Sequence, residues 1–174
     1  MVDYPLFQSP EWVDMERVKS WPAPVAIRYR EWFVSVIESR VDILRSLLEF
    51  EVQGLSPRDL EAAGLRAAAL LKEAPFSTAV GSHREMAHWG ISLATDMGLY
   101  VAKCLFDCCE GKIHWITPRE HKTDVSYNLP VIAGFGPGRL DPVFGSIAEA
   151  HGIILGQRDG RIWKEIYDFW RARA

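Results

Sequence analysis

Three cysteines and two histidines are the residues of this chain best suited to chemistry: Cys104, Cys108, Cys109, His114 and His121. Thiolates and imidazoles are ligands that zinc prefers, and a cysteine beside a histidine can act as a nucleophile. The Cys-x-x-x-Cys-Cys spacing differs from the paired Cys-x-x-Cys knuckles of structural zinc sites, and it falls where a helix also needs apolar residues. Because free cysteine packs as a small hydrophobe, we favour buried thiols. A small metal-dependent or Cys/His enzyme is the alternative hypothesis.

Two further motifs match catalytic patterns only in part. His83, Glu85 and His88 lack the His-Glu-x-x-His spacing that places two histidines on one helical face, so a helix cap with surface histidines explains them. The glycines of residues 134–138 lack the lysine of a P-loop and the spacing of a dinucleotide site, and Pro137 removes a backbone amide. We therefore expect a turn there, no catalytic residue, no metal and no cofactor.

The segment from Asp124 to Arg139, with Trp115 close before it, is the best candidate for a binding surface. Loops on a rigid scaffold often carry binding residues, and tyrosine, tryptophan and arginine are enriched at the energetic centres of interfaces. The predicted partner-binding residues are Trp115, Tyr127, Asn128, Phe135 and Arg139. The alternative is that the aromatic side chains turn inward and cover one end of the helices.

Length and composition indicate a single globular domain over residues 1–174, with 48% hydrophobic and 25% charged residues. The net charge of −3 leaves no basic face of the kind that nucleic-acid-binding modules carry. The chain begins without a signal-peptide pattern and has no apolar stretch of membrane-spanning length. Clustered, odd-numbered cysteines do not form a secreted disulfide framework. We expect a cytoplasmic protein without nucleic-acid or membrane partners.

Hydrophobic periodicity predicts a mainly α (α+β) fold, a helical bundle with a small β element and a Gly/Pro-rich loop around residues 112–140. An aromatic arm, residues 1–22, is expected to pack on the helical body, with a short helix at 10–19 capped by Ser9. The other helices are expected at about 24–52, 57–74, 82–109 and 141–155, with a last one opening at Asp159 or Gly160. The expected strands are at about 112–116 and 125–133.

Four small residues recur at every fourth position of the predicted helix 82–109: Gly90, Ala94, Gly98 and Ala102. Isolated helical glycines cost about 1 kcal/mol relative to alanine, so this ridge indicates a closely packed neighbour. We expect the alanine-rich helix 57–74 to be that neighbour, and we allow for a break near Thr95 or Gly98. The acidic residues of the same helix are expected on its solvated face: Asp96, Asp107 and Glu110.

Three short segments, Ala94–Tyr100, Ile113–Trp115 and Tyr127–Val131, resemble a pattern in small bacterial proteins of uncharacterised or immunity type. The resemblance covers residues 90–155. Immunity proteins of this kind are cytoplasmic, are encoded beside polymorphic toxins, and bind and block a toxin domain. The resemblance implies a non-enzymatic protein with a protein partner, and it assigns no binding residue. A third hypothesis is a homo-oligomer that associates through the aromatic stripe of the last helix: Trp163, Ile166 and Trp170.

Overall fold

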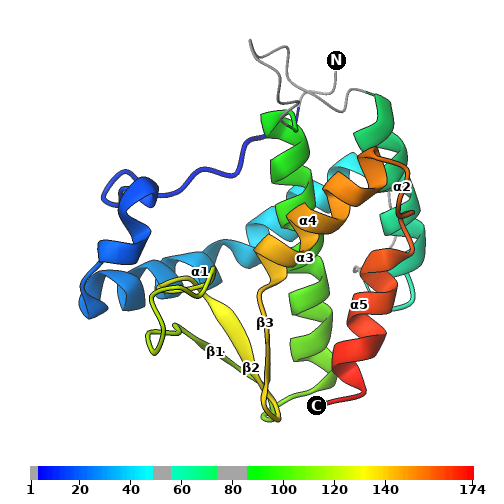
Figure 1. Cartoon of the computed structure of the whole chain (residues 1–174). Helices are drawn as coiled ribbons and strands as arrows, with labels where there is room; N and C mark the ends of the chain where they lie inside the picture. Colours follow the sequence, from blue (N-terminus) through cyan, green and yellow to red (C-terminus); the bar gives the residue numbers. More distant parts are fainter. Residues whose placement is uncertain (1–3, 49–55, 74–85) are drawn as a thin grey trace.

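A computed structural model describes residues 4–48, 56–73 and 86–174, and its helices surround one central helix, α3 (Figure 1). In chain order the elements are η1 (Met15–Ser20, a 3-10 helix), α1 (Ala23–Leu47), α2 (Leu60–Glu73), α3 (His88–Cys108), β1 (His114–Ile116), β2 (Val131–Phe135), β3 (Gly138–Leu140), α4 (Pro142–Ile154) and α5 (Ile162–Arg171). This arrangement confirms the mainly α fold with a small β element between residues 112 and 140.

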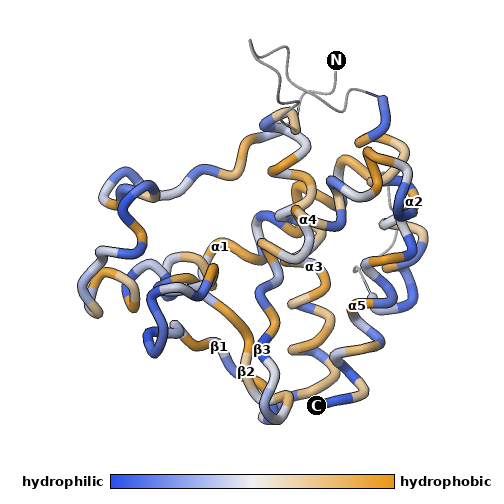
Figure 2. The backbone as a smooth tube through the Cα atoms, viewed as in Figure 1, coloured by the Kyte–Doolittle hydropathy of each residue, from blue (hydrophilic) through white to orange (hydrophobic). Residues whose placement is uncertain are grey.

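Helix α3 is the core of the molecule, and every residue from Ser92 to Ala102 is buried. Apolar residues dominate its length and that of β2, whereas hydrophilic residues gather around η1 (Figure 2). The helix runs without a break through Thr95 and Gly98. The capping pattern predicted before it, with His83 and Glu85, lies outside the described residues.

The ridge of small residues on α3 has two different neighbours. A Cβ atom on Gly98 would lie 2.0 Å from the Pro142 carbonyl oxygen, so the first turn of α4 rests directly on this glycine. A Cβ on Gly90 would instead meet the side chain of Leu71 in α2, at 3.3 Å. The expected packing of α2 on the ridge therefore holds at Gly90, whereas α4 lies against Gly98. Helix α4 approaches closely there because Gly98 has no Cβ atom, which leaves room for the Pro142 carbonyl.

The helix boundaries follow local hydrogen bonding. Asp141 caps α4 as predicted, and its Oδ1 accepts from the backbone N–H groups of Val143 and Phe144 at 3.1 and 2.9 Å. Helix α2 begins at Leu60, later than predicted, because residues 56–59 form a turn in which the Asp59 N–H donates to the Ser56 carbonyl. Helix α1 ends at Leu47, before the predicted residue 52. Gly54 and Pro75, which follow the two predicted helix ends in the sequence, lie outside the described residues.

The β element is an antiparallel sheet in the order β1-β2-β3, with Trp115 opposite Ile132 and Phe135 opposite Gly138. Strand β3 was not predicted, and β2 starts at Val131 because residues 121–129 form consecutive turns. The predicted turn is the hairpin between β2 and β3. Its Gly136 has φ +70°, the left-handed conformation that a glycine at this hairpin position adopts without strain.

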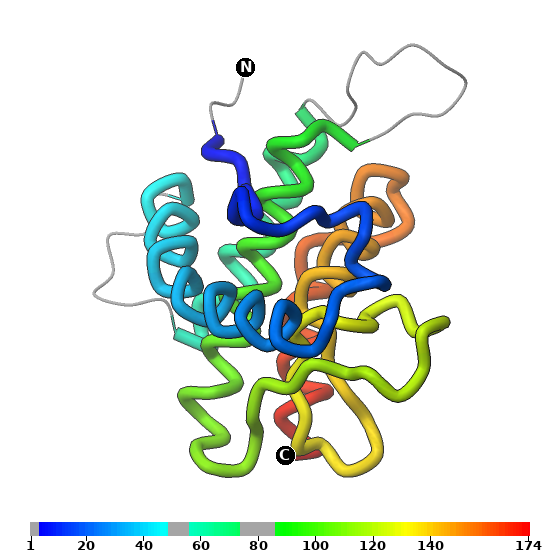
Figure 3. Tube along the Cα trace, turned by 90° about the vertical axis from the view of Figure 1, so that its left-hand side faces the viewer, coloured from blue at the N-terminus to red at the C-terminus, as the bar shows by residue number. Residues whose placement is uncertain are grey.

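The N-terminal arm reaches from the start of α3 to the start of α1 (Figure 3). Tyr4 and Trp21 are buried, whereas every residue between them is half-buried or exposed. The predicted helix at 10–19 is wrong. The Val13 N–H closes a turn onto Pro10, and the 3-10 helix starts only after Asp14, which caps it in place of Ser9.

Candidate functional site

Three of the predicted partner-binding residues, Tyr127, Asn128 and Phe135, are buried. Asn128 is an internal link between the β element and the arm, because its amide donates to the carbonyl oxygens of Val18 at 2.7 Å and Trp21 at 3.3 Å. Its own side-chain oxygen accepts from Arg119, and its backbone has φ +68°. The predicted surface role of Asn128 and its neighbour Tyr127 conflicts with this burial, since the turns at 121–129 fold the two side chains inward.

The two predicted aromatic contacts beyond Tyr127 pack on separate parts of the body. Trp115 stacks on Phe106 of α3 with ring centroids 5.6 Å apart, and it meets Phe33 of α1 edge to face. Phe135 packs against Trp170 of α5 at 4.8 Å. The sheet therefore covers the ends of α3 and α5 and the middle of α1. The aromatic side chains turn inward, which is the alternative that the sequence left open, and the five predicted residues do not form one surface.

Arg139 is the exposed member of the predicted set. Its guanidinium donates to the carboxylates of Glu120 and Asp124, each at 3.2 Å. Backbone hydrogen bonds and Arg139 lower the pKa of the Glu120 carboxyl. Exposed ion pairs of this kind contribute little to stability, so Arg139 is available to a partner without being committed to the fold.

The aromatic stripe of α5 also faces inward. Trp163 is fully buried and donates from its indole nitrogen to the Ser146 hydroxyl at 3.2 Å, and Trp170 packs on Phe135. Ile166 is half-buried against the core. The residues proposed for an interface between copies thus hold α5 to α4 and to the sheet.

The cysteines and histidines do not converge. Cys104 is buried, whereas Cys108, His114 and His121 are exposed. Burial raises the pKa of the Cys104 thiol to about 12. Within residues 4–48, 56–73 and 86–174, no group of three or more His, Cys, Asp or Glu side chains could hold a metal ion.

An apolar hollow of about 160 Å³ lies beneath the arm, and we call it the arm groove. Its walls come from four segments that are distant in sequence: the arm, α1, the turn before β2, and α4. The apolar side chains that line it are Phe7, Met15, Tyr29, Phe33, Leu129, Pro130, Val143, Phe144 and Ile147. Lined by apolar side chains from several elements, it has the character of a binding pocket rather than a polar active site.

The rim of the arm groove is exposed and apolar. Phe144 is 55% exposed and Met15 is 37% exposed, and they approach the groove from α4 and from the arm. Phe7 lines this groove and also a second hollow of about 260 Å³, which the exposed Leu6 and residues at the start of α3 line as well. The two hollows therefore adjoin at Phe7.

Asp141 is the charged residue in the lining of the arm groove, and both of its carboxylate oxygens already accept hydrogen bonds within the chain. One carboxylate oxygen caps α4 by accepting from the N–H groups of Val143 and Phe144. The other accepts from the Ser126 hydroxyl at 2.6 Å. The groove therefore offers apolar contact, and Asp141 shapes its wall by fixing the start of α4.

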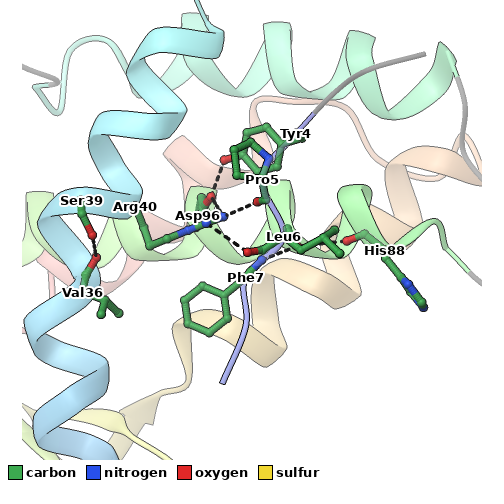
Figure 4. A network of polar contacts seen from close by, with 10 residues as sticks. Tyr4, Pro5, Leu6, Phe7, Val36, Ser39, Arg40, His88 and Asp96 are labelled. Carbon is green, nitrogen blue, oxygen red and sulfur yellow. Dashed lines mark hydrogen bonds and ion pairs between the residues drawn. The ribbon is translucent and has the colours of Figure 1, made fainter. Parts of the chain in front are cut away.

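A buried polar network holds the start of the arm above α3 (Figure 4). Arg40 donates to both carboxylate oxygens of Asp96, from Nε at 2.8 Å and from Nη2 at 2.6 Å, and Tyr4 donates its hydroxyl to the same carboxylate. Arg40 also donates to the backbone carbonyls of Pro5 at 2.9 Å and Leu6 at 3.4 Å. Paired and hydrogen-bonded charges are the form in which ionic groups are tolerated in a core.

This network corrects the prediction that Asp96 lies on a solvated face, although Asp107 and Glu110 are exposed as expected. A signal was present in the sequence, because Asp96 stands inside an apolar run and Arg40 falls on the apolar stripe of α1, seven residues after Phe33. Burial raises the pKa of Asp96, and the hydrogen bonds from Arg40 and Tyr4 oppose that rise. Burial and the Asp96 carboxylate raise the pKa of Tyr4, which keeps its hydroxyl a donor at neutral pH.

No family model, curated protein or solved structure matches this chain. Among the helices of the described ranges, none combines the length and the hydropathy needed to cross a membrane.

Proposed function

We propose that this chain is a non-enzymatic cytoplasmic binding protein of immunity type, which blocks a toxin domain by taking apolar side chains of that partner into the arm groove. The observation that carries the proposal is the apolar hollow. Its rim residues Met15 and Phe144 are exposed to solvent although both side chains are apolar. Exposed apolar groups that gather at a concave site are typical of interaction surfaces.

The chemistry of the groove defines the part of the partner that fits it. Its walls are aromatic and aliphatic, and the Asp141 carboxylate is engaged by Ser126 and the start of α4. A large aliphatic or aromatic side chain therefore gains contact there, whereas a charged side chain would lose water without a counter-ion. By the area rule for apolar burial, covering the exposed parts of Phe144 and Met15 contributes roughly 2–3 kcal/mol each. Only part of this gain remains after the entropic costs of association.

The arm is suited to such binding because contacts along its length fix it on the helices. Tyr4 and Trp21 are buried. Besides these two, the Phe7 N–H donates to the Ser92 hydroxyl at 2.9 Å, and the Arg28 guanidinium lies 4.2 Å from the centre of the Trp12 ring. Because the arm is already positioned over the groove, it loses little conformational freedom on binding, and this favours affinity.

The experiment is co-expression of the tagged chain with the proteins encoded beside its gene, followed by native mass spectrometry of the purified complex. Phe144→Ala is expected to weaken the complex about tenfold, which corresponds to about 1.4 kcal/mol. Leu155→Ala is the matched control, because Leu155 is 51% exposed just after the end of α4 and does not line the groove. No complex with any neighbouring product, or equal losses in both variants, would contradict the proposal.

A further inference from the structure

Two cysteine side chains meet where α3 ends. Cys108 is the last residue of the helix and Cys109 is its C-cap, and their sulfur atoms lie 3.1 Å apart. Neighbouring residues inside a helix do not face each other. The contact exists because Cys109 leaves helical geometry, with φ −118° and ψ 36°, and turns its thiol back toward Cys108.

The two thiols differ in access to solvent. Cys108 is exposed and donates weakly to the Leu105 carbonyl at 3.4 Å, whereas Cys109 is 6% exposed. A small oxidant therefore reaches Cys108 first and finds a second thiol directly behind it. An accessible cysteine next to a resolving cysteine is the arrangement that redox-responsive sites use.

The charged and titratable groups around the pair come from three elements. Burial and the neighbouring Cys108 raise the pKa of Cys109 to about 11, and Lys112 and Arg171 oppose that rise. The Tyr167 hydroxyl of α5 faces Cys108, and its pKa is raised by burial and by that thiol. Cys109 is therefore present as the thiol, which releases its proton when it attacks Cys108.

We propose that Cys108 and Cys109 are a site of reversible thiol oxidation, at which a hydroperoxide joins the two residues in a vicinal disulfide. In the first step the Cys108 sulfur attacks a peroxide oxygen, the O–O bond breaks, and Cys108 becomes a sulfenic acid as an alcohol or water leaves. In the second step the Cys109 sulfur attacks the Cys108 sulfur, the S–O bond breaks, and water leaves with the Cys109 proton. The two thiols lose two electrons and two protons, and the peroxide is reduced.

The resulting bond is expected to be readily reversible. Adjacent Cα atoms lie about 3.8 Å apart, below the roughly 4.4–6.8 Å that disulfides usually span, and such deviations make the bond more reducible. Strained, exposed disulfides are the labile ones. A dithiol reductant should therefore restore both thiols.

The test treats the full chain with hydrogen peroxide, alkylates the remaining thiols and digests it with chymotrypsin. Cleavage after Phe106 separates Cys104 from the Cys108–Cys109 pair. We expect the peptide with the pair to lose the mass of two hydrogen atoms and to resist alkylation until a dithiol is added. Cys104 should remain alkylatable after unfolding.

Cys109→Ser removes the second thiol, and its Cys108 is expected to gain oxygen instead of losing hydrogen. Cys104→Ala is the matched control and should behave as the unaltered chain does. Oxygen gain at Cys108 in the unaltered chain, a disulfide that includes Cys104, or the absence of any reaction would overturn the proposal. The outcome is decided by the mass of the peptide from the unaltered chain. The test therefore remains valid even if a variant fails to fold.

Discussion

The N-terminal arm and the β element, residues 112–140, differ in how their aromatic and apolar composition relates to solvent exposure. The β element has the Trp, Tyr and Phe residues that suggest a binding surface, yet it buries Tyr127 and Phe135 and half-buries Trp115. The arm, expected only to pack on the body, keeps Leu6 and Met15 exposed beside two hollows. A high content of aromatic residues therefore indicates that a segment makes contacts, but it does not indicate whether those contacts are within the chain or with a partner.

The difference has a physical origin in what lies beneath each segment. The sheet covers the ends of α3 and α5 and the middle of α1, so side chains on its inner face find apolar neighbours within the chain. The arm crosses from α3 to α1 with few backbone hydrogen bonds of its own, and among its described residues, 4–22, the buried ones are Tyr4 and Trp21. The span between those anchors leaves the arm groove open beneath it.

The largest expected effect comes from breaking the anchor of the arm. Asp96→Asn leaves the buried Arg40 guanidinium without its carboxylate, and removing one partner of a buried ion pair costs about 3–5 kcal/mol. Urea unfolding of both proteins measures this loss. Asp107→Asn is the control on the exposed side of the same helix, and it should change stability by less than about 0.5 kcal/mol. Equal effects at the two positions would mean that Asp96 is not an anchor.

The second effect tests whether the β element is structural. Asn128→Ala removes the hydrogen bonds to Val18 and Trp21 and places alanine at a positive φ, at an expected cost of about 2 kcal/mol. Thr123→Ala, in the same series of turns but exposed, should be neutral. A stable Asn128→Ala protein with weakened partner binding would restore Asn128 as a contact residue.

The third effect concerns Tyr4 and pH. Because the pKa of Tyr4 is raised in the folded protein, the folded state keeps this proton above pH 10, the ordinary pKa of tyrosine. The associated stability is complete below that pH and is lost as pH rises further, since the unfolded chain binds fewer protons there. Tyr4→Phe should cost about 1 kcal/mol at neutral pH and make the alkaline loss shallower. Denaturant midpoints across this range measure it, and an unchanged slope would exclude Tyr4 as a contributor.

The smallest effect is expected at Arg139, the exposed residue of the predicted binding set. Arg139→Ala removes surface ion pairs with Glu120 and Asp124 and should change stability by less than about 0.5 kcal/mol. If the arm groove is the binding site, this variant also binds the partner as the unaltered chain does. Titration calorimetry beside Phe144→Ala compares the two regions directly, and a larger loss for Arg139→Ala would move the interface to the β element.

The parts of the fold that local signals determine could be predicted from the sequence. The periodicity of α1 and α3, the cap of α4 at Asp141 and the turn at residues 134–138 each depend on neighbours along the chain. The Arg40–Asp96 pair joins residues far apart in sequence, so spacing on either helix alone assigned Asp96 to solvent. The closest partner of Gly98 and the exposure of the arm likewise depend on how the helices assemble, which no local pattern contains.

Hydrogen exchange of the chain, alone and in its complex with the partner encoded nearby, tests the central claim most directly. The account predicts that binding slows exchange in the arm between Tyr4 and Trp21 and in the first turns of α4. Residues 112–128 and 131–140, which do not line the groove, should exchange at the same rates in both samples. Protection confined to residues 112–140, with the arm unchanged, would contradict the assignment of the arm groove as the binding site.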